Sequence, residues 1–457
     1  MLDYMDYIVR AFEKSTNWNR DSSYENITST SRALLEFHIP KTFKFQTSNR
    51  STTNTFSTLE IDRNNKINGS LTYLYTDADN VEKIVKSSSQ VLLQDATETY
   101  RHIQPFFSRQ LDDITHAFEP KSLYYGRIYY PKSTLEAMII KRFNVNTQLV
   151  VKCISNMYSD MNIMLLNWQR TKGQNLQEFV VSSNGLLCGY RVLHNFISSP
   201  SKFNNSLYNN SSMSLGGEVW LGLSTLTPGC STTLRYCTNS ANTGRPLTLT
   251  FSWNPLFGHI SSSYTAMTTS NSTISAKYDF NLFSIDSNLS FGCEFWKSGS
   301  KINDPDLESS FENVATFETT TSNTSDAGPV TTRHYSTVEN DVLSLSPHEE
   351  RLLNDLTDTF SESLQKMDKE KSIIERFKNK FRNENFTQVW KFATSLRDRN
   401  LKILWEGKFR EFLISAGTEL VFSRDVLISK GFDDSNNAQN NNSKIPAKFG
   451  IKIQYSV

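Results

Sequence analysis

KFGIKIQYSV, residues 448–457, is the stretch of sequence that decides the fold. Every odd-numbered side chain from Phe449 to Val457 is apolar or aromatic, whereas Lys452, Gln454 and Ser456 are polar and Gly450 has no side chain. Because a β-strand points alternate side chains to opposite faces, this strand has one apolar and one polar face. A sheet that closes on itself must pair its last strand with an early one. We therefore expect a closed β-barrel with an apolar outside and a polar inside.

The same alternation recurs through most of the chain. It begins at Phe43, and its clearest examples are Leu247–Trp253, Ile274–Phe280 and Leu289–Phe295. Clusters rich in Asn, Ser, Gly and Pro separate the runs, as turns require. Setting aside roughly 40 leading and roughly 100 inserted residues leaves about 315, enough for about 19 membrane strands of roughly 10 residues. Counting the runs directly gives about sixteen to nineteen strands.

Bulk composition excludes several classes of protein. The 48 basic residues balance 47 acidic ones, so no bulk attraction to nucleic acid or anionic lipid is expected. No window holds the roughly 18 uninterrupted apolar residues of a transmembrane helix. The N-terminal residues include Asp3, Asp6 and Glu13 and resemble neither a secretory signal nor a transit peptide. A bacterial outer-membrane barrel is therefore not expected, and a eukaryotic organelle membrane remains.

The chain divides into four segments. Residues 1–41 are expected to form an amphipathic helix and a lead-in, in or near the lumen, with Leu2, Met5, Val9 and Phe12 at helical spacing. Residues 42–296 hold the first barrel strands and 401–457 the closing ones. Between them, 297–400 reads as an insertion without strands, made of an acidic loop at 303–347 and a helix from about His348 to Phe381. This helix is either an arm for a partner or a lineage-specific insertion.

Residues that carry chemistry are sparse. The seven histidines are isolated, and the five cysteines form no CxxC pair, so we expect no metal site, cofactor or catalytic centre. Basic and acidic side chains on the polar faces of the strands are predicted to line the lumen: Arg127, Lys277 and Lys452 with Asp279 and Glu294. This mixture of signs argues against a strongly selective ion filter. A passive pore remains possible unless the N-terminal helix fills the barrel.

Leu71, Tyr73 and Tyr75 form an apolar and aromatic stripe on one strand face. Such a stripe can contact lipid as part of an aromatic girdle. It can also bind a partner protein within the membrane, where the tyrosine hydroxyls would find hydrogen-bonding groups. Two adjacent tyrosines on one face exceed what a girdle needs, so we expect these three residues to contact a partner.

The pattern Lys448-x-Gly450-x-x-Ile453-x-Tyr455 resembles the β-signal of mitochondrial outer-membrane barrels. It has a polar residue, a glycine that permits close backbone approach, and two hydrophobic residues on one face. The whole chain resembles the fungal mitochondrial distribution and morphology barrel proteins, a family of porin-like mitochondrial barrels. The segments that carry this likeness are Met1–Met5, Ser29–Phe37 and the long late insertion.

This resemblance implies a barrel of about 19 strands in the mitochondrial outer membrane at contacts with the endoplasmic reticulum (ER). The implied partners are subunits of the ER–mitochondria encounter structure, the sorting and assembly machinery, small subunits of the outer-membrane translocase, and membrane lipids. No nucleic acid is implied. If the C-terminus faces the intermembrane space, as in the family, the insertion is expected on the cytosolic side. Three functions stay open: a non-enzymatic scaffold, a metabolite or protein channel, and a soluble β-rich adhesin.

Overall fold

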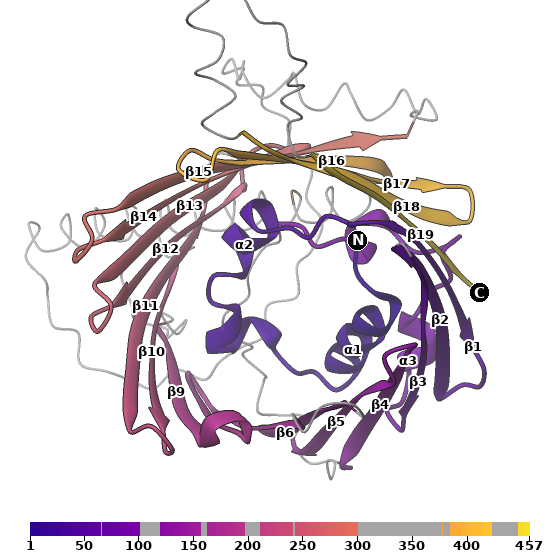
Figure 1. The fold of residues 1–457 in the computed structure, drawn as a ribbon, viewed down its shortest axis with the longest axis horizontal. Coiled ribbons are helices and arrows are strands. Elements are labelled where there is room, and N and C mark those ends of the chain that lie inside the picture. Colours follow the sequence, from indigo (N-terminus) through magenta and orange to yellow (C-terminus); the bar gives the residue numbers. More distant parts are fainter. Residues whose placement is uncertain are drawn as a thin grey trace, which may run out of the picture. The chain divides into compact units, whose positions relative to one another are not determined.

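A single sheet of 19 strands closes into a barrel in the computed structural model (Figure 1). The model describes residues 1–64, 66–100, 119–156, 162–196, 211–240, 243–299, 377, 384–422 and 447–457. Nearly all of them belong to one compact unit, Met1–Ser298 with Glu370–Val457. The predicted all-β barrel of about 19 strands with an N-terminal helix is confirmed.

The strands follow one another around the barrel in chain order. They are β1 Phe43–Arg50, β2 Thr55–Asn64, β3 Lys66–Thr76, β4 Lys121–Tyr130, β5 Thr134–Asn144, β6 Thr147–Asn156, β7 Ile163–Lys172, β8 Asn175–Ser182, β9 Leu187–Phe196, β10 Ser212–Gly222, β11 Thr227–Asn239, β12 Pro246–Asn254, β13 His259–Thr269, β14 Ser272–Asn281, β15 Ser287–Ser298, β16 Phe386–Ser395, β17 Asn400–Phe409, β18 Phe412–Val421 and β19 Ala447–Ser456. The helical elements are α1 Tyr4–Ser15, η1 Arg20–Ser22, η2 Tyr24–Asn26, α2 Ser29–Leu35, α3 Val81–Ile84, α4 Leu93–Ala96 and η4 Asn184–Leu186.

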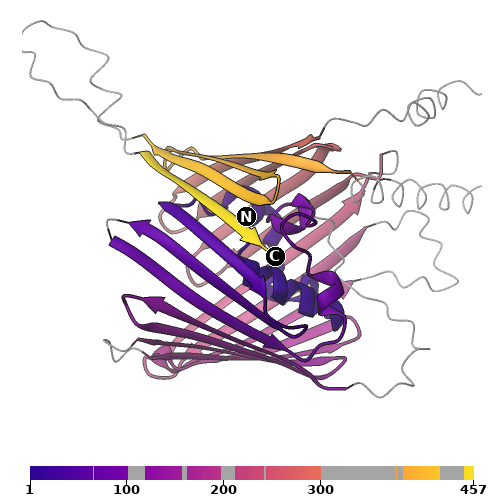
Figure 2. The same ribbon diagram turned by 90° about the vertical axis from the view of Figure 1, so that its right-hand side faces the viewer.

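One parallel pair closes the barrel. β1 pairs with β19 in parallel, from Phe43 opposite Ile451 to Ser48 opposite Ser456. All other neighbouring strands are antiparallel. An odd number of strands in an up-and-down barrel requires this, because the first and last strands then run in the same direction. Figure 2 shows the tilted strands from the side, with β19 at the front.

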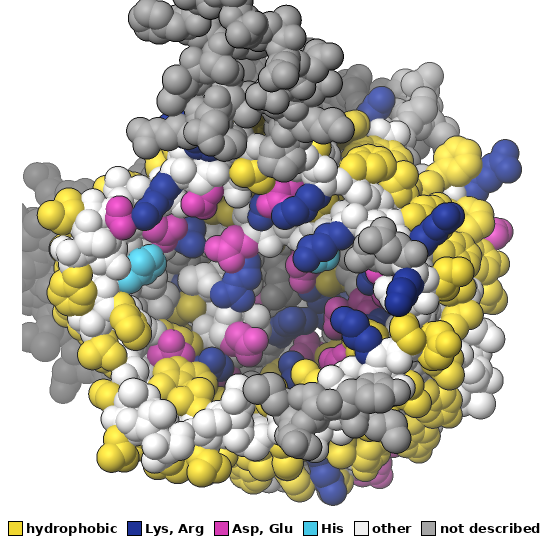
Figure 3. All heavy atoms as spheres, in the orientation of Figure 1, with side chains coloured by type: hydrophobic (Ala, Val, Ile, Leu, Met, Phe, Trp, Pro, Cys, Tyr) yellow, Lys and Arg dark blue, Asp and Glu magenta, His cyan; other side chains and the backbone are white. Residues whose placement is uncertain are grey.

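The two faces of the wall differ as predicted. On β19, Gly450, Gln454 and Ser456 are buried inside, whereas Phe449 is exposed and Ile453 and Tyr455 share its face. Charged side chains gather in the interior, and hydrophobic side chains cover the outside (Figure 3). A soluble β-sandwich has the reverse arrangement, with its apolar face inward. The outer surface is that of a barrel that sits in an apolar medium.

Two strands were not predicted, and the second of them corrects a predicted boundary. β13 was not predicted, and β16 lies inside the range 297–400 that was interpreted as a strand-free insertion. On β16 the inward residues Val389 and Ala393 are apolar, and they pack against other apolar side chains inside the barrel. This packing hides the alternation of polar and apolar residues. The predicted loop 303–347 lies outside the described residues, as does the helix His348–Phe381 except for Phe377.

The additional strand also reverses the expected side of the insertion. With four strands after it instead of three, the insertion leaves from Ser298 and returns at Phe386 at the same end of the barrel as Ser456. The expectation that the insertion and the C-terminus face opposite sides was therefore wrong. Separately, none of the helices in the described part of the chain is long and apolar enough to cross a membrane.

Candidate functional site

Residues 1–42, which we call the inner segment, run once around the inside of the barrel before β1 begins (Figure 1). Met5, Ile8 and Phe12 of α1 are buried with side chains of β2 to β5, among them Phe56 and Leu74. α1 thus places an apolar face against a part of the wall whose inward residues are apolar. The sequence left its placement open, in or near the lumen, and in the structure α1 lies inside the barrel (Figure 1).

After α1 the inner segment continues along the opposite wall. The Tyr24 hydroxyl lies 2.8 Å from the Ser231 hydroxyl of β11, and Ser23 donates to the Glu178 carboxylate of β8 at 2.7 Å. α2 then packs against β13 to β16. Phe37 and Ile39 join an apolar cluster with strands β16 and β17. The inner segment is therefore anchored around the whole circumference.

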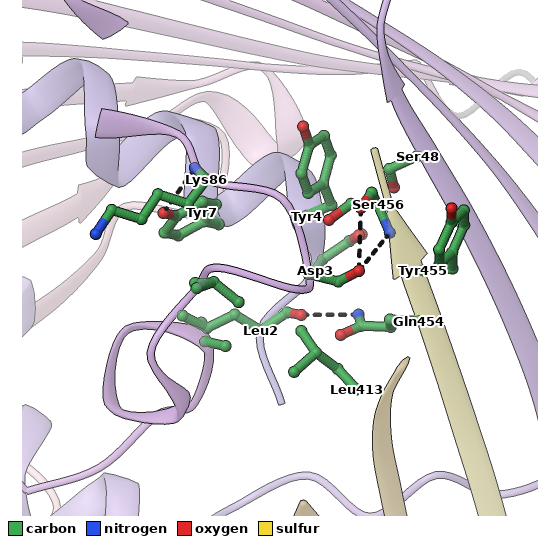
Figure 4. Close-up of a pocket in the computed structure, with 13 residues that line it drawn as sticks. Leu2, Asp3, Tyr4, Tyr7, Ser48, Lys86, Leu413, Gln454, Tyr455 and Ser456 are labelled. Atoms are coloured by element: carbon green, nitrogen blue, oxygen red, sulfur yellow. Dashed lines mark hydrogen bonds between the residues drawn. The ribbon is translucent and has the colours of Figure 1, made fainter. Parts of the chain in front are cut away.

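The inner segment also meets the seam between β1 and β19. Gln454 of β19 donates to the Leu2 carbonyl at 2.8 Å and to Gln46 of β1 at 2.9 Å. Gln46 in turn donates to Asp3 at 2.6 Å. Figure 4 shows Leu2 and Asp3 beside Gln454 in the small pocket under the end of β19. The first residues of the inner segment thus bridge the two closing strands from inside.

Gly450 lies where the inner segment passes into β1. A Cβ atom at this position would lie 2.1 Å from the Pro40 carbonyl oxygen and 2.8 Å from the Thr42 nitrogen. The Ile451 amide donates to the Thr42 carbonyl at 3.2 Å. Glycine is therefore required by the close approach of two backbones, which is the reason the sequence suggested for it.

The other residues of the predicted β-signal have ordinary strand partners. Lys448 contacts Glu419 of β18 at 3.4 Å, and the Tyr455 ring lies 5.5 Å from that of Phe412 on the outside. Ile453 pairs with Ile414 on the same outer face. These contacts fit a closing strand. Recognition of the pattern by insertion machinery stays a prediction.

The five residues predicted to line the lumen all belong to the inward face. Arg127 pairs with Asp3 of the inner segment at 2.8 Å, and Lys277 with Glu36 at 3.2 Å. Asp279 lies 3.4 Å from Lys277. Glu294 accepts from the Trp296 indole at 2.5 Å, and Lys452 shares its strand face with Gln454. Two of the five therefore hold the inner segment directly, which the sequence did not predict.

The predicted contact stripe lies on the outside of β3. Leu71, Tyr73 and Tyr75 are exposed by 58%, 54% and 40%. Tyr75 lies one residue from the end of β3 beside Tyr124, at the depth of an aromatic girdle. Tyr73 lies deeper, opposite Gly126 of β4. Neither phenol hydroxyl has a hydrogen-bond partner within the described part of the chain.

The family model described as mitochondrial distribution and morphology protein 10 matches residues 1–457. The chain belongs to this family. Proteins of that name from Saccharomyces cerevisiae (strain YJM789) and Zygosaccharomyces rouxii are 51% and 52% identical to it, over 100% of both chains in each comparison. A further relative of that name, from Candida glabrata, is 47% identical over the same full coverage.

In this member of the mitochondrial distribution and morphology protein 10 family, the wall holds charged groups that sequence reasoning missed. Lys391 of β16 lies 3.2 Å from Glu406 of β17, and both are almost fully buried. Arg142 of β5 is fully buried, donates to Thr16 at 3.2 Å and lies over the Trp18 ring at 4.6 Å. Lys391 lies in a strand that the sequence did not predict, and no sequence signal identified the partners of Lys391 or Arg142.

The inner segment carries two carboxyl groups with opposite behaviour. Burial opposes ionisation of Asp3, but Lys452 and Arg127 outweigh it and lower the pKa of the Asp3 carboxyl. Burial, together with the Asp3 carboxylate, raises the pKa of Asp6. Asp3 is thus held charged as an anchor to the wall.

The described residues contain no group of three or more potential ligands that could hold a metal ion. The five cysteines, all within that part of the chain, are free thiols of intermediate exposure. The site that the structure offers is therefore a pair of surfaces, the anchored inner segment and the outward stripe of β3.

Proposed function

We propose that this chain is a non-enzymatic scaffold of the mitochondrial outer membrane that supports mitochondrial distribution and morphology. In this proposal it anchors the ER–mitochondria encounter structure and also joins the sorting and assembly machinery, and so supports lipid exchange between the organelles. Small subunits of the outer-membrane translocase are further partners in it. Membership of the family supports the proposal, and so do the two surfaces described above.

The observation that carries the proposal is the outward pair Tyr73 and Tyr75. The Tyr73 hydroxyl lies deeper in the wall than a girdle, and a phenol hydroxyl without a partner in an apolar medium costs free energy that a hydrogen bond to a partner protein recovers. Beside Tyr73, Gly126 leaves open space, since a Cβ there would meet nothing within 4 Å. Glycine on a membrane-facing surface lets a partner's backbone approach closely.

The test is co-purification from detergent-solubilised mitochondria. The double variant Tyr73→Ala, Tyr75→Ala should insert normally and lose at least one membrane partner. The matched control is Tyr264→Ala with Tyr278→Ala, two outward tyrosines of similar exposure on β13 and β14. Unchanged recovery of every partner with the first variant would refute the role of the stripe.

Conductance separates the scaffold from the channel. Purified protein in a planar bilayer should give no robust voltage-gated steps, because the inner segment is anchored to the wall around the whole circumference. Reproducible voltage-gated steps of uniform size would favour the channel.

A further inference from the structure

Charged side chains are rare on the outer face of the barrel. Along the 19 described strands no carboxylate points outward, and the cations that do are Arg63, Lys141, Arg170, Lys172 and Lys297. β10 to β14 contribute none, because their charged residues, such as Arg235 and Lys277, lie on the inward face. Lys141, Arg170 and Lys172, which we call the basic arc, gather most of the outward charge on two strands, β5 and β7.

Burial shows that the basic arc faces outward. Lys141 shares its strand face with Ile139, which is 41% exposed, whereas Arg142 is buried inside. Arg170 and Lys172 share theirs with the exposed Trp168. A charged side chain on the apolar wall of a barrel is costly unless it reaches the headgroups of the lipids.

The basic arc occupies one end of its strands. β5 ends at Asn144 and β7 at Lys172, at the same end of the barrel as β19, since all odd-numbered strands run in one direction. At the other end the same part of the wall shows Tyr130, Leu135 and Met164 outward. Cations that only mark the boundary with water would occur at both ends. The outward charge therefore favours one leaflet.

An aromatic pair orients the first cation of the basic arc. The Lys141 amine lies 5.3 Å from the centre of the Phe143 ring, two residues nearer the end of β5. The Phe143 ring in turn stacks on that of Trp168 of β7, with 5.8 Å between their centres. This contact directs the amine toward the end of the barrel, where headgroups lie.

Arg170 lies between two polar residues of the neighbouring strands. Thr147 of β6 and Gln177 of β8 stand directly opposite it and share its outer face. β6 separates Arg170 from Lys141, so their backbones are about 10 Å apart at the usual strand spacing. The two long side chains can close around one phosphate group, with the flanking hydroxyl and amide as further donors.

Acidic side chains do not offset the basic arc. The only acidic residues of β4 to β9, Glu136 and Glu178, lie on the inward face. On the described part of the connection from β3 to β4, Asp79 and Glu119 pair with Lys121 at 2.8 and 3.2 Å. The outer face of β4 to β9 therefore has no carboxylate to hold the ammonium group of a zwitterionic lipid.

We propose that the basic arc binds the phosphate group of an anionic phospholipid, in the leaflet at the end of the barrel where β19 ends. Lys141 and Arg170 hold the phosphate, as cations near a membrane surface do. Ile139 and Trp168, deeper on the same faces, offer the acyl chains an apolar wall, which free phosphate does not need. This inference rests on the membrane placement in the proposed function and needs none of the partners named there.

The test is native mass spectrometry of the purified full chain in detergent, with equal amounts of phosphatidic acid and phosphatidylcholine of the same acyl chains. The parent should retain phosphatidic acid preferentially. Lys141→Gln with Arg170→Gln should lower this preference about 25-fold, which is about fivefold for each cation. The matched control is Arg63→Gln with Lys297→Gln, which removes one Lys and one Arg from other outward positions and should keep the preference of the parent.

Equal retention of both lipids by the parent, or an equal loss of preference in both variants, would overturn the proposal. Displacement of phosphatidic acid by an equal concentration of inorganic phosphate would also overturn it, because the site would then recognise free phosphate. In mitochondria, a photo-cross-linking amino acid at Gln177 should label lipid, and an adduct with an acidic protein segment instead would refute the choice of ligand. Since the purified chain has no partner proteins, failure here leaves the scaffold role to its own co-purification test.

Discussion

Gly450→Ala offers the sharpest test of how the barrel closes. The added methyl would lie 2.1 Å from the Pro40 carbonyl oxygen and 2.5 Å from its carbon, whereas ordinary contact begins at 3.4 Å. The backbone at Pro40 must therefore retreat by about 1.3 Å, the difference between the ordinary and the built distance to oxygen. That movement pulls on the hydrogen bond from Ile451 to Thr42, which joins β19 to the chain entering β1.

The expected loss of stability follows from these two effects. Overpacking of this kind costs about 1–3 kcal/mol. Weakening one backbone hydrogen bond adds about 1 kcal/mol. We expect a loss of about 3 kcal/mol in the free energy of unfolding, which is about a hundredfold in the folding equilibrium constant.

The assay is refolding of the purified chain from denaturant into detergent micelles, followed by denaturant unfolding. No insertion machinery is present, so a defect cannot arise from failed recognition of the β-signal. Gly126→Ala on β4 is the matched control, since its Cβ meets nothing within 4 Å. Alanine favours a strand over glycine by about 0.5–1 kcal/mol, so the control should be slightly more stable than the parent.

An unfolding midpoint of Gly450→Ala equal to that of the parent would refute the packing argument. The Pro40 carbonyl would then not press on β19, and the glycine would matter only for recognition. Parallel import into isolated mitochondria shows whether insertion requires Gly450 beyond this packing. Loss of import with an unchanged unfolding midpoint, and with Gly126→Ala normal in each assay, would assign Gly450 to recognition, whereas loss of stability would by itself account for a loss of import.

Three further outcomes follow from the charges and the topology. The folded-state pKa of Asp3 lies below its ordinary value of 3.8, so the pairing of Asp3 with Arg127 stabilises the barrel fully above pH 3.8. This stabilisation is lost as the pH falls through the lower pKa of the folded state. Asp3→Asn should therefore remove this acid-sensitive part of the stability, measured by unfolding as a function of pH. Glu406 has two buried cationic partners, Lys391 and the Met1 amino group. Lys391→Met removes one of them and should destabilise the barrel in thermal unfolding by less than the about 3–5 kcal/mol that complete loss of a buried pair costs, because the Met1 amino group remains. An unchanged melting temperature would contradict the pairing of Lys391 with Glu406. Epitopes placed within 303–347 and after residue 457 should be cut by protease added to the same side of the membrane, because Ser298, Phe386 and Ser456 lie at the same end of the barrel. Cleavage from opposite sides would contradict the order of the strands.

Periodicity predicted the barrel because its outer face is apolar nearly everywhere. β12, β14 and β15 show this most clearly, with rows such as Leu247–Trp253 outside and small polar residues inside. The same rule failed where the inside is also apolar. β16 was missed because Val389 and Ala393 pack inward, and this omission reversed the predicted side of the insertion.

The candidate site was predictable only in part. The outward direction of Tyr73 and the inward direction of Arg127 follow from strand alternation. The partners of inward residues do not, because they depend on a segment that returns to the wall hundreds of positions away. Arg235, for example, donates to the Asp21 carbonyl at 3.0 Å, and no local pattern links these two residues.

The inner segment also bears on whether the barrel can act as a gated pore. Met5, Ile8 and Phe12 are almost fully buried, and exposing three such side chains to water costs about 5–9 kcal/mol. Residues 1–42 contain six acidic and five basic side chains, a net side-chain charge of −1. Moving one charge through 100 mV supplies about 2.3 kcal/mol, only about half of the smaller cost. A membrane potential of that size therefore does not release the inner segment, and its place against the wall is a fixed part of the fold.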